Sequence, residues 1–210
     1  MPRKLVRLIS VILCMALLCC ATPALAAVQN DYDYAYALWN LGVFQGTDVG
    51  LELERTPTRA EGLTMLVRLL GAEEEAAALT GADIPFTDVP EWAHGYVAYA
   101  YQQNLTKGIS ETEFGSNLET TADAYSTFLL RCLGYSDAAG DFSYETAFLS
   151  AMALELFDNA LYDEILGGGF TRGNLAHMSY LTLLHNCKDS PDTLLARLVS
   201  HGKLDEALAQ

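Results

Sequence analysis

The sequence predicts an all-α protein built from three diverged copies of one helical unit of roughly fifty to sixty residues. The clearest evidence is a gapless match between residues 58–71 and 121–134, each of which begins with threonine and ends with glycine. A weaker third copy begins at Thr171 and runs to about residue 186. The second observation is the helical spacing of apolar residues within the copies, which indicates the fold class.

Apolar residues recur at positions i, i+3, i+4 and i+7 in the first two copies, the spacing of an amphipathic helix. The glycine that closes each copy, Gly71 or Gly134, suits the left-handed backbone conformation at the end of a helix. In the third copy the spacing is less regular. The apolar positions are Leu63, Leu66, Val67 and Leu70 in the first copy and Tyr125, Phe128, Leu129 and Cys132 in the second.

Each unit also contains an earlier helix, predicted at residues 34–41 in the first unit and 144–157 in the third. In the middle unit Asp88 can cap a helix whose Trp92 lies in the first turn. That helix should end near Asn104, because asparagine tolerates positive φ.

Turn-rich connectors separate the two helices of a unit, at residues 46–58 and 108–121 in the first two units. In the third unit the glycine triplet 167–169 is interpreted as a turn, because no Gly-Lys-Ser/Thr follows it as in a phosphate loop. A short Ala/Glu-rich helix is expected at 73–79. One or two short helices are expected over 191–209.

The first 26 residues have the pattern of a secretory signal peptide. A basic start precedes an apolar run over residues 8–20 and the small residues of an Ala-Leu-Ala cleavage site at 24–26. An uncleaved anchor is the alternative, although the run is short for a membrane span. The mature chain would then comprise one domain over 27–190, which the repeats nearly fill, and a helical tail. The repeats are placed at about 31–72, 85–135 and 141–187, and the tail at 191–210.

The mature chain is strongly acidic. All 27 Asp and Glu residues and nine of the twelve Lys and Arg residues follow the signal peptide, which gives a formal charge of −18. Such a charge disfavours nucleic acid and anionic membrane surfaces as partners. No later stretch is apolar enough to insert into a membrane after cleavage of the signal. Cys132 and Cys187 remain in the mature chain, and they either pair in a disulfide or serve as small core residues.

No catalytic, metal or cofactor site is expected. The chain contains neither a Gly-x-Ser-x-Gly nor a His-Glu-x-x-His sequence, and no carboxylate pair is marked as that of a glycosidase. His185 and Cys187 lie close in sequence, but no second ligand pair accompanies them. The sequence therefore predicts a protein that is not an enzyme.

Two motifs resemble those of the S-layer homology family. Residues 86–93, Phe-Thr-Asp-Val-Pro-Glu-Trp-Ala, resemble the opening of its motif, and residues 58–61, Thr-Arg-Ala-Glu, resemble its signature tetrapeptide. The order of opening, helix, glycine-containing connector, tetrapeptide and second helix also agrees. The resemblance covers about residues 31–187 and implies three consecutive motifs in a pseudo-three-fold helical arrangement.

The resemblance also implies a function and a location. Such domains hold proteins noncovalently at the bacterial cell wall or cell surface by binding secondary cell-wall polysaccharide, which often carries pyruvate ketals. Binding grooves would lie between adjacent motifs, with the tetrapeptide arginine facing the groove. The polysaccharide-binding residues expected on this basis are Thr58, Arg59, Glu61, Trp92, Thr171 and Arg172.

Elementary chemistry explains part of the tetrapeptide without a ligand. Thr58 and Glu61 form a capping box by themselves. Arg59 is different, because a cation at the first helical position opposes the helix dipole unless an anion lies nearby. A ligand role is therefore favoured for Arg59 over a surface role, and binding is expected to concentrate on Arg59, with Arg172 second. Arg172 is placed in the same way, with Asn174 where the first unit has glutamate, and it is read equally well as a ligand or as a surface arginine. Trp92 could stack on a sugar, but core packing is the favoured reading.

The copies also depart from the family pattern. The second unit has Thr-Ala-Asp-Ala at residues 121–124 and so lacks the arginine, and its cap is expected to shift to Thr120. The first unit lacks the Phe-x-Asp-Val-Pro opening. These losses leave a second hypothesis, a secreted structural or interaction module that keeps the fold, binds other envelope proteins and has lost strong glycan binding.

Overall fold

The computed structural model describes residues 30–205, so the predicted signal peptide lies outside the described residues. Within this range the protein is helical and contains no strand, which confirms the all-α prediction. The elements are α2 (Asp31–Asn40), α3 (Arg59–Leu69), α4 (Glu73–Ala77), the 3₁₀ turn η1 (Glu91–Ala93), α5 (His94–Gln102), α6 (Ala122–Cys132), η2 (Tyr144–Thr146), α7 (Ala147–Ala153), α8 (Asn159–Gly168), α9 (Arg172–Leu184) and α10 (Leu194–Ser200).

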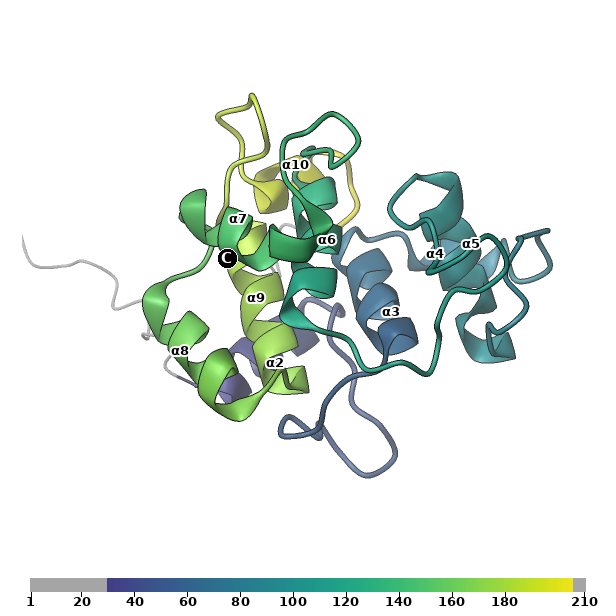
Figure 1. The fold of residues 1–210 in the computed structure, drawn as a ribbon, viewed down its shortest axis with the longest axis horizontal. Helices are drawn as coiled ribbons and strands as arrows, with labels where there is room; N and C mark the ends of the chain where they lie inside the picture. The colour runs from purple at the N-terminus through teal and green to yellow at the C-terminus, as the bar shows by residue number, and fades with distance from the viewer. Residues whose placement is uncertain (1–29, 206–210) are drawn as a thin grey trace, which may run out of the picture.

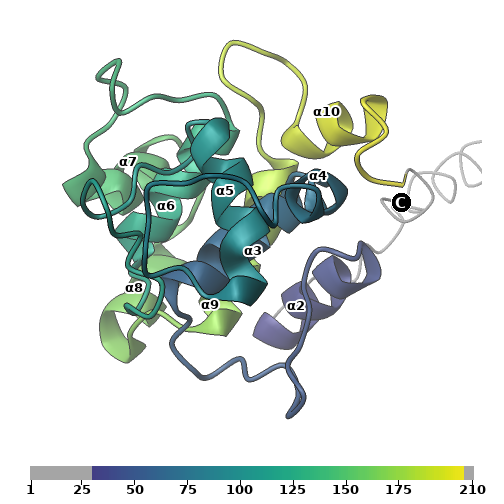
Figure 2. The same ribbon diagram turned by 90° about the vertical axis from the view of Figure 1, so that its right-hand side faces the viewer.

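The second helices of the three units, α3, α6 and α9, contact one another and lie in the middle of the molecule (Figure 1). Each also packs on the first helix of a different unit: α3 on α5, α6 on α7, and α9 on α2. Figure 2 shows α2 and α10 on one side of this centre and α7 and α8 on the other. A buried hydrogen bond of 2.6 Å joins the Tyr125 hydroxyl of α6 to Ser179 Oγ of α9. A true three-fold symmetry stays a prediction.

The ends of the second helices agree with the sequence pattern. Thr58 and Glu61 form a capping box on α3, and Thr171 and Asn174 form one on α9. Gly71 and Gly134, which follow α3 and α6, have φ of 60° and 97°. The expected shift of the α6 cap to Thr120 is wrong.

The cap of α6 is Thr121, whose side chain accepts a hydrogen bond from the Ala124 amide at 3.1 Å. The neighbouring Asp123 is used elsewhere, because its carboxylate accepts from the Phe148 amide of α7 at 2.9 Å. The second unit therefore keeps a threonine cap at the position that the repeat predicts. Asp123 instead ties α6 to α7.

Asp88 does not cap a helix. Its carboxylate accepts hydrogen bonds from the backbone amides of Phe114, Gly115 and Ser116 at 2.7, 2.7 and 3.0 Å, and so holds the second connector. Burial alone would raise the pKa of Asp88, but these amides lower it below its usual value. The helix of this unit begins as the 3₁₀ turn η1, and it ends before Asn104, whose φ of 58° confirms the predicted stop.

The third unit differs most from its prediction. The glycine triplet is not a simple turn, because α8 runs through Gly167 and ends at Gly168, with Gly169 as its C-cap. The N-cap of α8 is Asp158, which accepts from the Leu161 amide at 2.9 Å. The expected helix over 144–157 is shortened to η2 and α7, because the backbone turns at Glu155 with a φ of 59°.

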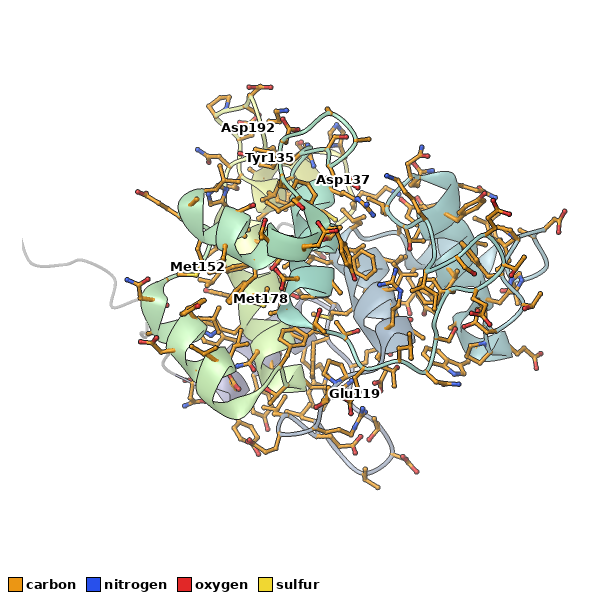
Figure 3. All side chains as sticks on the ribbon, viewed as in Figure 1. Glu119, Tyr135, Asp137, Met152, Met178 and Asp192 are labelled. Carbon is orange, nitrogen blue, oxygen red and sulfur yellow. The ribbon has the colours of Figure 1, made fainter. Side chains whose placement is uncertain are left out.

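The remaining short helices, α4 and α10, lie where the sequence places them. Between residues 30 and 205, no helix is both long and apolar enough to cross a membrane. Cys132 and Cys187 are buried free thiols. Arg131 on the body of α6 pairs with Asp137, which lies in the loop after that helix (Figure 3).

Candidate functional site

Three of the predicted site residues, Glu61, Trp92 and Arg172, line one pocket of about 340 Å³. We call it the inter-unit groove, because it lies between α3 and the first connector of unit one, η1 and α5 of unit two, and the N-terminus of α9 of unit three. Its lining is Phe44, Gln45, Gly46, Thr47, Glu61, Thr64, Met65, Arg68, Trp92, Tyr96, Arg172 and Leu175.

Trp92 is exposed over 55% of its surface, so the expectation that it packs in the core is wrong. The 3₁₀ turn explains the difference, because it directs the neighbouring Ala93, fully buried, into the core in its place. The indole therefore lies at the rim of the groove. An exposed aromatic ring in that position can stack on an apolar face of a ligand.

Arg172 lines the same groove and is only 7% exposed. Its Nε donates to the Leu51 carbonyl and its second terminal nitrogen to the Gln45 carbonyl, both at 3.1 Å. The guanidinium also lies 5.1 Å from the centre of the Phe44 ring. Burial lowers its pKa from the ordinary arginine value. The side chain is thus held rigidly by the first connector.

Glu61 carries the charge nearest to Arg172, with 3.6 Å between the carboxylate and the guanidinium. The same carboxylate accepts two hydrogen bonds from Arg55, at 2.9 and 2.7 Å, and one from the Thr58 amide at 2.7 Å. Burial would raise the pKa of Glu61, but the hydrogen bonds from Arg55 and Thr58 lower it to about 2. Glu61 is therefore ionised, and its hydrogen bonds go to Arg55 and Thr58. Because its one negative charge faces both Arg55 and Arg172, the positive charge of Arg172 is only partly neutralised.

A second cation, Arg68, lies along the same groove. Its Nε pairs with Glu73 at 3.0 Å, and a terminal nitrogen donates to the Tyr96 hydroxyl at 3.2 Å. Tyr96 in turn donates to Glu73 at 2.6 Å. This network fixes both the guanidinium and the phenol ring, whose centre lies 5.4 Å from the guanidinium carbon.

Thr64 contributes an unused hydroxyl to the groove. The residue is 5% exposed, and its Oγ1 is buried without a hydrogen-bond partner among the described residues. A buried hydroxyl of this kind costs free energy unless something bonds to it. The groove thus combines an exposed indole, two oriented guanidinium groups and a free hydroxyl.

The other predicted residues, Thr58, Arg59 and Thr171, do not line the groove. Arg59 is 8% exposed, and its Nε donates to the Phe114 carbonyl of the second connector at 2.9 Å. Its guanidinium lies between two aromatic rings, 4.9 Å from Phe114 and 5.2 Å from Phe128. The structure therefore places Arg59 and Arg172 in matching roles, each against a connector.

The N-termini of α3 and α9 are already occupied by backbone partners. The Arg59 amide donates to the Leu118 carbonyl, and the Arg172 amide donates to the Arg55 carbonyl, both at 2.8 Å. Thr58 and Glu119, which is labelled in Figure 3, form an isolated backbone bridge. These amides are therefore not free to bind an anion. Backbone carbonyl oxygens, rather than a ligand, stabilise the arginines that stand unfavourably at the helix N-termini.

Sequence reasoning missed Thr64, Arg68 and Tyr96 as groove residues. One signal could have indicated Arg68, because it matches Arg131 in the gapless alignment of the repeats. For Thr64 and Tyr96 the sequence offers no such signal. Their place in the groove depends on how α3 and α5, which belong to different units, meet in space.

A larger cavity of about 960 Å³ lies between α2, α8 and α9 and contains none of the predicted site residues. Acidic side chains line it, among them Asp31, Glu54 and Glu164. Burial, and then the charges of Glu164 and Glu54, raise the pKa of Asp31 to about 6. Within residues 30–205, no three His, Cys, Asp or Glu side chains are placed to hold a metal ion together.

Comparison with known proteins gives three relatives. The chain is 31% identical over 152 residues to a cell surface protein of Thermoanaerobacter kivui, a match that covers 68% of this chain and 20% of the relative. It is 30% identical over 112 residues to a surface layer protein of Brevibacillus choshinensis, covering 52% of this chain and 10% of the relative. It is 33% identical over 85 residues to a middle cell wall protein of Brevibacillus brevis, covering 40% and 8%.

The chain is related to bacterial surface-layer and cell-wall proteins. No protein-family model matches it. The matched segments span a fifth or less of the relatives' own lengths. These names support the predicted location at the cell wall or cell surface, and all three describe surface proteins rather than enzymes.

Proposed function

We propose that this protein is an S-layer homology module that attaches noncovalently to the secondary polysaccharide of a bacterial cell wall through the inter-unit groove. The observation that carries the proposal is that one groove contains both an exposed indole, Trp92, and a buried and oriented guanidinium, Arg172. The relationship to cell-surface proteins supports the same reading.

The groove suits a sugar that carries a carboxylate. A pyranose ring can stack its apolar face on Trp92, while the carboxylate approaches Arg172 and Arg68. Both guanidinium groups are held by other contacts, so little side-chain entropy is lost on binding. Local positive charge is needed here, because the acidic chain as a whole repels an anionic polymer. This assigns the groove, with Arg172 rather than Arg59, as the principal contact.

Trp92→Ala is expected to weaken attachment about ten-fold, because it removes the stacking surface at the rim. The fold should be retained, since the indole is more than half exposed. The measurement is pelleting of the mature protein with purified cell-wall sacculi, with and without their secondary polymer.

Tyr101→Ala is the matched control for this experiment, because Tyr101 is a 40% exposed aromatic residue of α5 outside the groove. It should pellet like the parent protein. Pelleting that does not depend on the secondary polymer would refute the proposed function. Equal pelleting of the Trp92→Ala and Tyr101→Ala proteins would remove Trp92 from the site.

Thr64→Val is expected to have opposite effects on stability and on binding. Replacing a buried, unpartnered hydroxyl by a methyl group of similar shape should raise the free energy of unfolding by about 1 kcal/mol. Loss of a hydrogen bond to the ligand should weaken polymer binding about five-fold. Urea denaturation and sacculus pelleting measure the two effects.

The control for Thr64→Val is Ser126→Ala in α6, which removes another buried, unpartnered hydroxyl outside the groove. It should leave binding unchanged. If Thr64→Val binds as well as the parent protein, the hydroxyl makes no contact with the polymer.

The second candidate function is a structural or protein-interaction module without strong glycan binding. The second unit favours it, because Ala122 stands where the other units have arginine. The acidic charge of −18 for the mature chain favours partners among other envelope proteins. Such a module would not distinguish sacculi with and without secondary polymer, so the same pelleting experiment separates the two functions.

A further inference from the structure

One face of α2 carries large aromatic side chains that the fold leaves in solvent. Tyr32, Tyr36 and Trp39 follow at i, i+4 and i+7 and are 54%, 52% and 52% exposed. Ala35 and Leu38, on the side of α2 that packs into the core, are fully buried. The exposed face is therefore not a requirement of core packing, and we call these three side chains the α2 platform.

Two rings of the platform lie close together in nearly parallel orientation. The Tyr36 and Trp39 rings are 6.0 Å apart between centroids, with only 9° between their planes. An exposed face of either ring suits the C–H-bearing face of a pyranose ring, which stacks on an aromatic face. Both side chains have only two rotatable side-chain bonds, so ordering them on binding costs little entropy.

The platform forms one wall of a pocket of about 640 Å³, and the turn Gly46–Leu51 forms the other. Hydrogen bonds between Thr47 and Gly50 hold the turn, from the Thr47 amide at 2.8 Å and from the Gly50 amide at 3.2 Å. The Thr47 hydroxyl also donates to Glu52 at 2.7 Å. The second wall is thus built before any ligand arrives.

The pocket borders the inter-unit groove. Gly46 and Thr47 line both, so the groove and the platform lie on either side of the same turn. A polymer chain seated in the groove can cross the turn and continue onto α2. No lysine or arginine lines the platform pocket, and its one carboxylate, Glu52, is engaged by Thr47 and Arg55. The chemistry therefore suits an uncharged sugar ring.

We propose that Tyr36 and Trp39 form a second sugar-stacking subsite, which binds an uncharged pyranose ring of the same polysaccharide chain that occupies the inter-unit groove. This inference rests on the proposed function of the groove for its ligand. The platform extends the contact by a separate element, α2, and it explains why a helix that is buried on one side carries three half-exposed aromatic residues on the other.

The experiment uses the two tryptophans of the chain as separate reporters, because Trp39 lies on the platform and Trp92 in the groove. In a Trp92→Phe protein the intrinsic fluorescence reports on the platform, and in a Trp39→Phe protein it reports on the groove. Each protein is titrated with secondary polysaccharide released from purified sacculi. Both signals are expected to change over the same concentration range.

Affinity for the released polysaccharide is measured for Tyr36→Ala, with Leu166→Ala, an exposed apolar residue of α8, as the control. Tyr36→Ala should weaken binding about three- to ten-fold, and Leu166→Ala should not change it. Far-ultraviolet circular dichroism of each variant establishes that the fold is intact.

The outcomes separate the two proposals. If Trp92 responds while Trp39 stays silent and Tyr36→Ala binds normally, the subsite is overturned and the proposed function stands. If Trp39 responds but Trp92→Ala binds normally, the platform binds the polysaccharide, but the groove as its site and the link between the two are overturned. If neither tryptophan signal changes, both the subsite and the proposed function are refuted. A concentration-dependent dimer that Trp39→Ala abolishes without polymer would also overturn the subsite, because a second copy would then cover the platform.

Discussion

Gly95→Ala should lower the free energy of unfolding by about 2–4 kcal/mol, the opposite of what alanine does in most helices. Gly95 is the second residue of α5, and a Cβ there would lie 2.2 Å from the carbonyl oxygen of Ala76 in α4. The obstacle is backbone, so α4 and α5 would have to move apart. Urea denaturation of the parent and variant proteins measures the difference.

Gly167→Ala is the matched control, because Gly167 also lies within a helix, α8, and a Cβ there would meet nothing within 4 Å. This variant should be as stable as the parent or more stable by up to about 1 kcal/mol. If Gly95→Ala behaves like Gly167→Ala, the close approach of α4 to α5 is not as the structure describes.

Glu61→Gln should cost about 2–3 kcal/mol of stability at neutral pH, because the charged acceptor for Arg55, Arg172 and the Thr58 amide is lost. The effect should depend on pH. The pKa of Glu61 is lowered to about 2 in the folded protein, below its unfolded value of about 4.5. Its contribution to stability is therefore complete above about pH 4.5 and is lost as the pH falls toward 2.

Denaturation of the two proteins at a series of pH values tests this expectation. The difference in unfolding free energy should be constant between pH 5 and 7 and should shrink at lower pH. Glu111→Gln, at an exposed position of the second connector, is the control and should show no such dependence. A difference that persists unchanged at pH 2.5 would contradict the assignment of the lowered pKa to Glu61.

Helices and caps could be predicted from the sequence because their causes are local. The spacing of apolar residues, the threonines at positions 58 and 171, and the glycines at 71 and 134 each act within a few residues of the structure that they specify. All of these features agree with the structure. Where the local signal was ambiguous, as at the glycine triplet that ends α8, the prediction was wrong.

The partners of polar groups could not be predicted in this way, because they lie far away in the sequence. Asp88 has the sequence pattern of a helix cap, yet it binds amides 26 to 28 residues away. Arg172 bonds to carbonyls more than 120 residues earlier. The candidate site could not be predicted for the same reason. Its residues come from all three units, so the repeat alignment indicates Glu61, Trp92 and Arg172 separately but not their shared groove.

The packing of α2 on α9 also has a consequence for how the chain folds. Tyr34 of α2 stacks on His177 of α9 with 3.7 Å between ring centroids, so α2, the first of the described helices, finds this partner only when the third unit emerges. Contacts of such long sequence separation slow folding and hold a growing chain in an incomplete state. A fragment ending after the second unit would leave the buried face of α2 uncovered. The three units are therefore expected to fold together, and the smallest piece that can be transplanted to another protein is the complete set.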